Sequence, residues 1–378
     1  MSCEKITVAE ARKKEAIGKS VPVTRSLLKT VKYSYLLSAF LFLIVLAQGA
    51  RAEISDFEIV KVYDAAPHSA FTDLIRFNDT FYITFRTGTG HIPGKQTGEG
   101  DGDIPILSSK DGKNWQLVAS LTKKTFDLRD PKLSVTPDGR IMVLMGGSVY
   151  IDGKLTDKVP HVSFSDKDGK NFSPPQPLVI DPAIKNELDW IWRVTWHGNI
   201  GYGTGYGTAD GGKEWVASLV KTTDGIYYDL VKKFDRPNKP NEATARFLSN
   251  DEMRIFLRCE SGNGELGSAS APYTDWQWTD LGMRVGGPEM LVLPNGKLLF
   301  GHRVYEQSGV STVLSVQDTD GKLRNIARFP SRGDTSYPGF VVHDGKLWAS
   351  YYSSHEGKTS IYLAIVPLDK ILDESKND

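Results

Sequence analysis

Three segments of the chain place a side chain capable of nucleophilic or acid–base chemistry directly before an apolar run. They are "TSYPGFVV" with Tyr337, "NEATARFL" with Glu242 and "LRDPKLSV" with Asp130. A tyrosine hydroxyl has a reference pKa of about 10, so it becomes a good nucleophile only when a neighbouring base accepts its proton. A carboxylate can be that base, and a protonated carboxyl can be a general acid. The three residue types predict nucleophilic catalysis with proton transfer, provided that the fold brings them together.

A second set of side chains suits the binding of an anionic or polyhydroxylated ligand. Arginine matches a carboxylate with its planar guanidinium group, and histidine titrates in a range that suits acid–base catalysis. His91 lies in a glycine-rich loop and is a further candidate catalytic residue. The candidate ligand-binding residues are Arg86, Arg193, Arg258, Arg303, Glu289 and Trp192.

Each candidate also has a purely structural interpretation. Tyr337 and Trp192 suit core packing, His91 suits a solvated loop, Asp130 suits a turn cap, and the remaining residues suit ion pairs such as Glu242–Arg246 and Arg258–Glu260. The fold decides between these interpretations, because it determines which side chains share a cleft.

Six predicted β-hairpins must position these residues. In each hairpin, two apolar runs flank a tight turn built from Asn, Asp or Gly, which is typical of hairpin connections. The turns lie at 78–79, 138–139, 198–199, 250–251, 295–296 and 344–345. The candidate residues come just before the first strand of a hairpin or just after the second one.

A second repeat alternates with the hairpins. "SSKDGKNW" (108–115) and "SDKDGKNF" (165–172) match nearly residue for residue, "KTTDGIYY" (221–228) is a weaker copy, and "YTDWQW" and "DTDGKL" are degenerate versions. We expect Asp111, Asp168 and Asp224 to accept backbone N–H bonds in turns where glycine supplies a positive φ.

Together the two repeats predict an all-β, six-bladed propeller with four-stranded antiparallel blades. "FEIVKVY" (57–63) is expected to close the ring against "SIYLAIVPL". Because the inner strands of a propeller line its central channel, the residues before these strands are expected to converge at one face.

The first 52 residues have the composition of a leader. An apolar core over 36–47 follows basic residues and precedes a small-x-small site at 50–52, as in a secretory signal peptide. We expect cleavage after Ala52, a secreted or periplasmic protein without stable membrane insertion, and a propeller over 53–378; an uncleaved membrane anchor is the alternative.

Residues 53–378 carry 37 basic and 43 acidic residues, net −6, which gives no basic footprint for nucleic acid. Cys259 is the only cysteine after the leader, so burial rather than a disulfide must stabilise this domain.

Several segments resemble the sialidase (neuraminidase) superfamily. The "S-x-x-D-G-K-N-W/F" turns are similar to its Asp-boxes, "NEATARFLSNDEMRIFLR" resembles its blade with a glutamate before the inner strand, and "TSYPGFVVHDGKLWASYY" resembles its last blade. The resemblance implies Tyr337 as the nucleophile, Glu242 as its base, and Arg258 and Arg303 in the cluster that holds a substrate carboxylate. A neutral phenol can attack an anomeric carbon that carries a carboxylate, whereas an anionic nucleophile is repelled.

The first blade departs from that pattern. Phe71-Thr72 stands where the family has an arginine before the first inner strand, so Arg76 or Arg86 would have to replace it. The family's acid/base aspartate lies in the loop that follows. The candidates for that role here are His91, Glu99, Asp101, Asp103 and, from the next blade, Asp130.

These observations predict an exported glycoside hydrolase of sialidase type that cleaves an acidic sugar from glycans without a cofactor or metal ion. No histidine or cysteine group has the sequence spacing of a zinc site. One alternative is a polysaccharide lyase on uronate glycans, in which arginines neutralise the carboxylate and Tyr337 or His91 removes the α-proton. The other is a non-catalytic glycan-binding propeller. The sequence assigns no oligomeric state.

Overall fold

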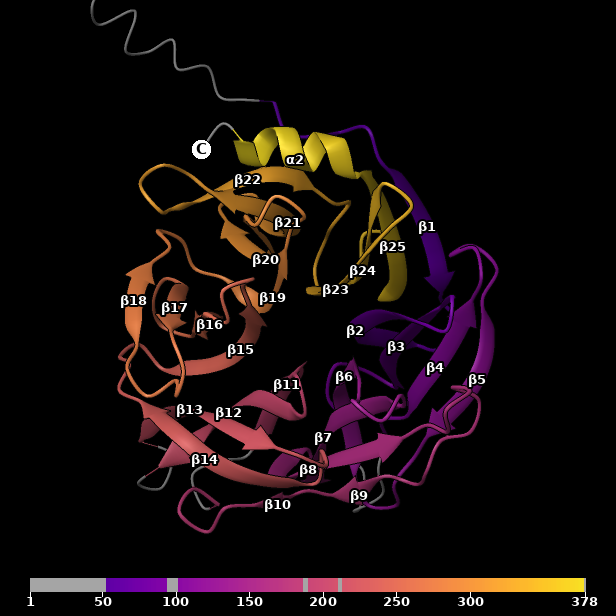
Figure 1. Cartoon of the computed structure of the whole chain (residues 1–378). Helices are drawn as coiled ribbons and strands as arrows, with labels where there is room; N and C mark the ends of the chain where they lie inside the picture. Colours follow the sequence, from indigo (N-terminus) through magenta and orange to yellow (C-terminus); the bar gives the residue numbers. More distant parts are fainter. Residues whose placement is uncertain (1–51, 94–100, 186–189, 210–212, 377–378) are drawn as a thin grey trace, which may run out of the picture. The chain divides into compact units, whose positions relative to one another are not determined.

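The structure is a computed structural model that describes residues 52–93, 101–185, 190–209 and 213–376. Glu53–Asp378 is one compact unit, in which six β-sheets surround a central axis as blades of a propeller (Figure 1). Neighbouring strands within five sheets are antiparallel throughout, and the third sheet adds a short parallel strand. The expected all-β, six-bladed fold is confirmed.

The chain builds the blades in sequence order, each from its inner strand outward. Blade 1 contains β2 (His68–Phe77), β3 (Thr80–Gly88), β4 (Ile104–Ser109) and β5 (Gln116–Leu121). Blade 2 contains β6 (Asp127–Val135), β7 (Ile141–Ile151), β8 (Lys154–Phe164) and β9 (Gln176–Pro177). Blade 3 contains β11 (Trp190–His197), β12 (Ile200–Ala209), β13 (Glu214–Thr222), β14 (Tyr227–Phe234) and the added β10 (Val179–Ile180).

The second half of the ring repeats this arrangement. Blade 4 contains β15 (Pro240–Phe247), β16 (Met253–Cys259), β17 (Glu265–Ala269) and β18 (Gln277–Asp280). Blade 5 contains β19 (Gly286–Val292), β20 (Leu298–Glu306), β21 (Gly309–Gln317) and β22 (Leu323–Arg328). Blade 6 contains β23 (Thr335–His343), β24 (Lys346–Ser353), β25 (Ser360–Pro367) and β1 (Glu58–Tyr63).

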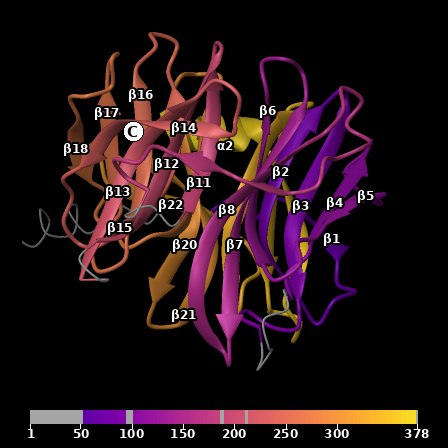
Figure 2. The same cartoon turned by 90° about the horizontal axis from the view of Figure 1, so that it is seen from below.

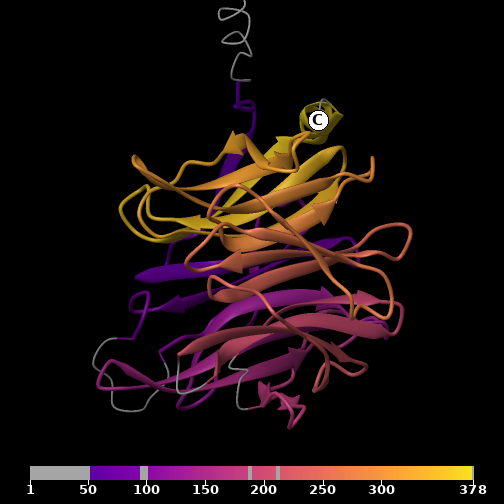
Figure 3. The same ribbon diagram turned by 90° about the vertical axis from the view of Figure 1, so that its left-hand side faces the viewer.

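The ring closes between the two ends of this unit. β1 pairs antiparallel with β25 as expected, so the first strand completes the last blade. A helix, α2 (Leu368–Lys376), follows β25 and lies on the outside of blades 5 and 6 (Figures 1 and 3). Its buried Leu368 and Ile371 join an apolar cluster that Leu299 and Leu347 share between those blades.

Among the described residues, no helix is both long and apolar enough to cross a bilayer. The leader at 1–51 lies outside them.

All six hairpin turns lie where the sequence places them, because each turn contains residues that tolerate a left-handed backbone. Asn78 and Asp79 both have positive φ, 46° and 55°, as a two-residue hairpin turn requires. Seen from the side, the blade strands run roughly along the propeller axis (Figure 2). β7 and β8, with 11 residues each, are the longest of the described strands.

The outer turns follow the expected chemistry at two of three places. Asp111 Oδ1 accepts the N–H groups of Lys113 and Asn114 at 2.9 and 2.8 Å, and Asp224 Oδ1 likewise accepts from Ile226 and Tyr227. In the second turn the prediction for Asp168 is wrong. Asp166, two residues earlier, accepts from the N–H of Lys170 and the side chain of Asn171. In that turn Ser165 pairs with Phe172 and the Asp166 N–H donates to the carbonyl of Asn171 at 2.8 Å, which places the Asp166 carboxylate beside these donors.

Every inner strand carries a β-bulge at the same level, and this repeated irregularity builds the site. In each inner strand the register with its partner shifts across two residues. The bulged pairs are Phe71-Thr72, Asp130-Pro131, Trp192-Arg193, Asn241-Glu242, Gly287-Pro288 and Tyr337-Pro338. A bulge locally breaks the ladder and redirects side chains, and it is typical of strands beside a functional site. Five of the candidate residues therefore occur at bulges rather than in regular strand: Asp130, Trp192, Arg193, Glu242 and Tyr337.

Candidate functional site

The centre of the site is a direct contact between two bulge residues from blades 4 and 6. The Tyr337 hydroxyl donates a hydrogen bond of 2.6 Å to Glu242 Oε1, and both side chains are buried. Tyr337 has a φ of 51°, in the left-handed region that non-glycine residues rarely adopt. Such backbone strain costs about 1–3 kcal/mol and is concentrated at functional sites. The two residues predicted as nucleophile and base are thus brought together.

The second oxygen of Glu242 is fixed by two donors. Oε2 lies 2.9 Å from Arg258 Nη1 and accepts the N–H of Gly287 at 3.0 Å. Burial by itself raises the pKa of Glu242, but Arg258 and the Tyr337 hydroxyl outweigh it and hold this pKa below its usual value. Glu242 is therefore ionised, with Oε1 available to accept the tyrosine proton.

Tyr337 lies in an aromatic and cationic environment. Its ring is stacked with Tyr352 at a centroid distance of 5.9 Å and meets Trp192 and Phe71 at 5.1 and 5.4 Å. Lys132 Nζ lies 5.4 Å from the ring centre, and burial lowers the pKa of Lys132 to about 8. Burial, followed by the negative charge of Glu242, raises the pKa of Tyr337 well above 10. The phenol is neutral at rest and requires a base.

Arg303 lies beside Tyr337, and residues of blade 6 hold its side chain in place. Its Nε donates to the carbonyl of Thr335 at 2.6 Å, Nη2 donates to the Tyr352 hydroxyl at 3.1 Å, and its guanidinium centre lies 5.8 Å from the Tyr337 ring. The Tyr352 hydroxyl in turn donates to Asp334 Oδ1 at 3.0 Å. Arg258 and Arg303 therefore both lie near Tyr337, Arg258 through its contact with Glu242 and Arg303 beside the ring.

Asp130 and His91 line an open cleft beside this centre. The cleft has a volume of about 300 Å³ and is also lined by Arg129, Tyr150 and Tyr206. Asp130 is partly exposed and has a φ of 47°. Burial, opposed by the charges of Arg129 and Lys132, raises the pKa of its carboxyl. A carboxyl with a raised pKa suits a general acid.

His91 lies at the rim of the cleft. Its Nδ1 is 2.7 Å from Asp334 Oδ2, its ring meets Phe71 edge-on, and Arg129 Nη2 donates to its carbonyl at 2.9 Å. Of the other loop candidates, Glu99 lies outside the described residues. Asp101 accepts from Thr89 and pairs with Arg86.

Four of the predicted ligand-binding residues are buried inside the protein: Arg86, Trp192, Arg193 and Glu289. Arg86 has no exposed surface, because its donors are taken up by Asp127, Asp101 and the carbonyl of Gly90. It therefore does not replace the arginine missing at Phe71, and Arg76, the other residue considered for that arm, pairs with Asp79 at the hairpin turn. Trp192 is 1% exposed and supports Tyr337 from within the core.

Arg193 and Glu289 form the buried centre of a charge network around the channel. Arg193 Nη1 contacts both oxygens of Asp73 at 2.9 and 2.8 Å, and its Nη2 lies 2.6 Å from Glu289 Oε2. Glu289 also pairs with Arg246, and Asp73 accepts the N–H of Leu133. These contacts link residues of blades 1 to 5, so in this conformation both residues bind protein rather than ligand.

Sequence reasoning missed four residues of the site. Asp334 orients Tyr352 and His91, Gly287 donates to Glu242, Lys132 lies against the Tyr337 ring, and Tyr352 stacks on it. Asp334 stands three residues before Tyr337 in an acidic "GD", and Gly287 occupies the bulge position of blade 5. An alignment of the six inner strands on their bulges would have indicated Gly287 and Lys132 as residues of the site.

A larger groove of about 830 Å³ lies elsewhere, at the hairpin-turn end of blades 2 and 3. It is lined by turn residues, including Asp138, Asp166 and Asp224. These carboxylates accept hydrogen bonds from their own turns. The bulge end of the channel therefore remains the candidate active site.

Comparisons with known proteins support the fold. No protein-family profile and no curated protein sequence matches the chain. Among solved structures, a protein of unknown function from Dyadobacter fermentans aligns with a TM-score of 0.69 and 19% identity, over 84% of this chain and 98% of that one. A Trypanosoma rangeli sialidase bound to sialic acid aligns with a TM-score of 0.60 and 11% identity, over 86% of this chain and 60% of that one.

A third similar structure is that of an enzyme with a different activity. An α-L-arabinofuranosidase from Fusarium graminearum, bound to an iminosugar inhibitor, aligns with a TM-score of 0.62 and 15% identity, over 83% of this chain and 98% of that one. The chain has a sialidase-like six-bladed propeller fold. The chain spans about 60% of the sialidase, and identities this low establish the fold alone.

Proposed function

We propose that this protein is an exported glycoside hydrolase of sialidase type, which uses Tyr337 as the nucleophile and Glu242 as its base to release an acidic sugar from glycans. The observation that carries the proposal is the 2.6 Å hydrogen bond from the Tyr337 hydroxyl to Glu242 Oε1. A structural tyrosine does not need an ionised, buried carboxylate as its partner, whereas a nucleophilic tyrosine does.

The geometry suits a two-step reaction. In the first step Glu242 Oε1 takes the phenolic proton while the tyrosine oxygen bonds to the anomeric carbon, and Asp130 protonates the departing glycosidic oxygen. In the second step Asp130 accepts a proton from the water that attacks the anomeric carbon of the tyrosyl-sugar intermediate, and Glu242 returns its proton to the tyrosine oxygen as the bond to the sugar breaks. Arg258 keeps Glu242 ionised and, with Arg303, provides positive charge for a carboxylate on the sugar.

One observation favours a second candidate, hydrolysis of a neutral glycoside. Phe71 occupies the bulge position of blade 1 and meets the Tyr337 ring at 5.4 Å, where the sialidase pattern has an arginine. An aromatic side chain there contributes no charge for a substrate carboxylate. The arabinofuranosidase structure is consistent with this candidate.

A substrate panel separates the alternatives. We expect the protein to hydrolyse a fluorogenic α-sialoside, or a neutral furanoside under the second candidate, and to release no product that absorbs in the ultraviolet as an unsaturated uronate does. Tyr337→Phe and Glu242→Gln are each expected to lower kcat by at least about 10²-fold, because each removes the nucleophile or its base.

The matched controls are Tyr227→Phe and Glu306→Gln, which change an exposed tyrosine in β14 and an exposed glutamate at the end of β20 that pairs with Arg328. Both are expected to keep wild-type turnover. Unchanged turnover in the Tyr337→Phe and Glu242→Gln proteins would exclude the proposed mechanism. An unsaturated product would instead assign a lyase, and binding of a glycan without turnover would assign a binding module.

A further inference from the structure

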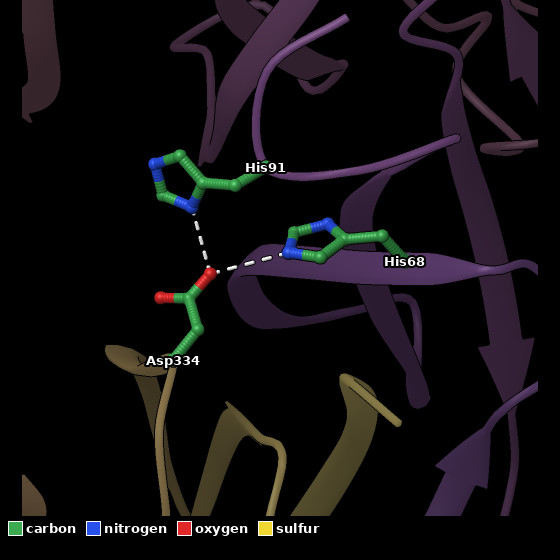
Figure 4. A group of neighbouring side chains, drawn as sticks. All are labelled: His68, His91 and Asp334. Atoms are coloured by element: carbon green, nitrogen blue, oxygen red, sulfur yellow. Dashed lines mark hydrogen bonds and ion pairs between the residues drawn. The ribbon is translucent and has the colours of Figure 1, made fainter. Parts of the chain in front are cut away.

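Three metal-ligating side chains meet at the rim of the candidate site although they are far apart in the sequence. They are His68 at the start of β2, His91 in the loop after β3 and Asp334 just before β23 (Figure 4). Asp334 Oδ2 lies 3.2 Å from His68 Nε2 and 2.7 Å from His91 Nδ1. The three ligand atoms all lie within 4.8 Å of one another.

The protein holds each of these side chains in place by contacts outside the group. Asp334 Oδ1 is occupied by the Tyr352 hydroxyl at 3.0 Å, with Arg303 Nη2 at 3.9 Å, so Oδ2 is the oxygen that faces the two imidazole rings. His68 is 8% exposed and meets Phe71 at a ring distance of 6.4 Å. The Phe71 ring also supports His91 at 5.3 Å. Hydrogen bonds to the outer atom of a ligand, such as that from Tyr352 to Asp334, orient the ligands in metal sites.

We propose that His68, His91 and Asp334 bind a divalent transition-metal ion of the Zn²⁺ class. Two imidazole nitrogens and one carboxylate oxygen suit Zn²⁺ and its neighbours in the first transition row, whereas Ca²⁺ and Mg²⁺ prefer ligand sets made of oxygen. Three protein ligands leave a fourth tetrahedral position to a water molecule or to an oxygen of a bound sugar. The ion would then lie close to the proposed nucleophile, because Asp334 accepts the hydroxyl of Tyr352, whose ring stacks on Tyr337.

Metal binding requires the distances between the ligand atoms to change by up to about 1.5 Å. Zinc–ligand bonds of about 2.0–2.2 Å place tetrahedral ligand atoms about 3.3–3.6 Å apart. The contact between His68 and Asp334 already has nearly this length, and the contact between His91 and Asp334 must lengthen by about 0.6 Å. The two imidazole nitrogens lie within 4.8 Å of each other, so they must approach by up to about 1.5 Å. The His91 side chain is 54% exposed, so its ring can move without disturbing the core.

The alternative is a hydrogen-bonded tether, in which both rings donate N–H groups to Oδ2 and no ion binds. The chain contains a matched case: His197 Nε2 lies 3.1 Å from Asp251 Oδ1, at the hairpin turns of blades 3 and 4, and no third ligand accompanies them among the described residues. A histidine–carboxylate pair alone is therefore available as an internal control.

The test uses tag-free protein that has been treated with a chelator and dialysed. Zn²⁺ is titrated by calorimetry, and the bound metal is counted by mass spectrometry. We expect one ion per chain and a higher Tm with Zn²⁺, because the ion binds the folded state. Loss of outer contacts alone typically weakens metal affinity by about 10–100-fold, so we expect His91→Ala to weaken it by about 100-fold or more. Bound Co²⁺ should give the intense visible absorption of a tetrahedral site.

The control His197→Ala should bind Zn²⁺ as the wild type does. A circular-dichroism spectrum and a metal-free Tm close to the wild-type values will show that the His91→Ala protein is folded. Asp334→Asn, which keeps an oxygen acceptor but removes the charge, is expected to bind as weakly as His91→Ala. The proposal is overturned if the wild type binds no stoichiometric ion, or if His91→Ala and His197→Ala have the same affinity. These readouts do not depend on turnover, so they stand apart from the proposed hydrolase activity.

Discussion

At the scale of single residues, Glu242 divides its two oxygens between two tasks. Oε2 is fixed by Arg258 and by the N–H of Gly287, and Oε1 faces the Tyr337 hydroxyl. The carboxylate therefore has a single orientation, and only one oxygen can accept a proton from the phenol. In the proposed reaction, proton transfer requires that Glu242 is ionised and that Asp130, the proposed acid, is protonated.

The pH profile of the proposed reaction follows from opposite pKa shifts. The pKa of Glu242 is lowered, so the base remains ionised until the pH falls through that value, and activity is lost on the acid side. The pKa of Asp130 is raised, so the acid remains protonated until the pH rises through that value, and activity is lost on the alkaline side. We expect a bell-shaped kcat/KM profile.

Asp130→Asn tests the assignment of the acid. It should remove the alkaline limb and lower kcat by about 10²–10⁴-fold for a poor leaving group, with much less loss for an activated aryl glycoside. The comparison variant is His91→Asn. If the alkaline limb persists in Asp130→Asn and disappears in His91→Asn, the acid is His91.

At the scale of the strand, the bulge in β19 depends on a glycine. Gly287 has a φ of 59°, and a Cβ built on it would lie 2.5 Å from Ser336 Oγ and 3.0 Å from the Tyr337 nitrogen. Gly287→Ala should therefore displace Tyr337 or break the hydrogen bond to Glu242. We expect a loss of activity of at least about tenfold and a stability loss of about 1–3 kcal/mol, measured by turnover and by denaturant unfolding.

Gly296→Ala is the control, in the hairpin turn of the same blade. Its φ is 80°, but a Cβ there has nothing within 4 Å. Gly296→Ala should lower the free energy of unfolding through backbone strain alone and leave turnover unchanged. Equal activity losses in the two variants would show that the space at Gly287 is not what positions Tyr337.

The neighbouring strand β20 contains a histidine that must stay neutral. His302 is fully buried, with its Nε2 2.9 Å from Ser315 Oγ, and burial lowers its pKa to about 4. The unfolded chain takes up this proton near pH 6.5, whereas the folded protein resists it until about pH 4. The contribution of His302 to stability is therefore complete above about pH 6.5 and falls as the pH decreases towards 4, by about 3 kcal/mol in total.

His302→Gln should flatten this part of the stability curve. The measurement is the free energy of unfolding in urea at several pH values between about 4 and 7. The relevant quantity is the slope, because Gln can lower stability at all pH values. An identical slope in the variant and the wild type would mean that His302 is already protonated in the fold.

At the scale of the whole molecule, the ring is held by the charge network around its channel as well as by apolar clusters between blades. Arg193 from blade 3 contacts Asp73 from blade 1 and Glu289 from blade 5. These strands face one another across the channel, so each ion pair bridges blades that are not neighbours in sequence. Removing one partner leaves a buried charge without compensation.

Glu289→Ala should therefore destabilise the propeller by about 3–5 kcal/mol. Glu306→Ala, which breaks the exposed pair with Arg328, should cost no more than about 1 kcal/mol. Denaturant unfolding of both variants provides the comparison. A cost near 1 kcal/mol for Glu289→Ala would show that water or local rearrangement compensates the buried arginines.

The local elements and the number of blades can be predicted from the sequence alone. Hairpin turns such as Asn78-Asp79 need residues that tolerate positive φ, and the apolar runs around them are periodic, so the blades and the closing strand could be predicted from short segments. Tyr337 and Glu242 could be predicted as partners because both stand at the start of an inner strand and the resemblance assigned them related roles. These features depend on contacts between residues close in sequence, or on a repeated pattern.

Ion pairs between distant segments depend on the tertiary structure. Arg86 lies in the second strand of its hairpin, as Arg258 and Arg303 do, and Arg193 and Glu289 lie in inner strands. Asp127 pairs with Arg86, and Asp73 pairs with Arg193, inside the protein. The spacing of His68, His91 and Asp334 along the chain indicates no metal site, yet the closed ring brings blade 6 against blade 1 and sets them within contact distance. Burial and ion pairing between distant segments arise from ring closure, and no short stretch of sequence carries that information.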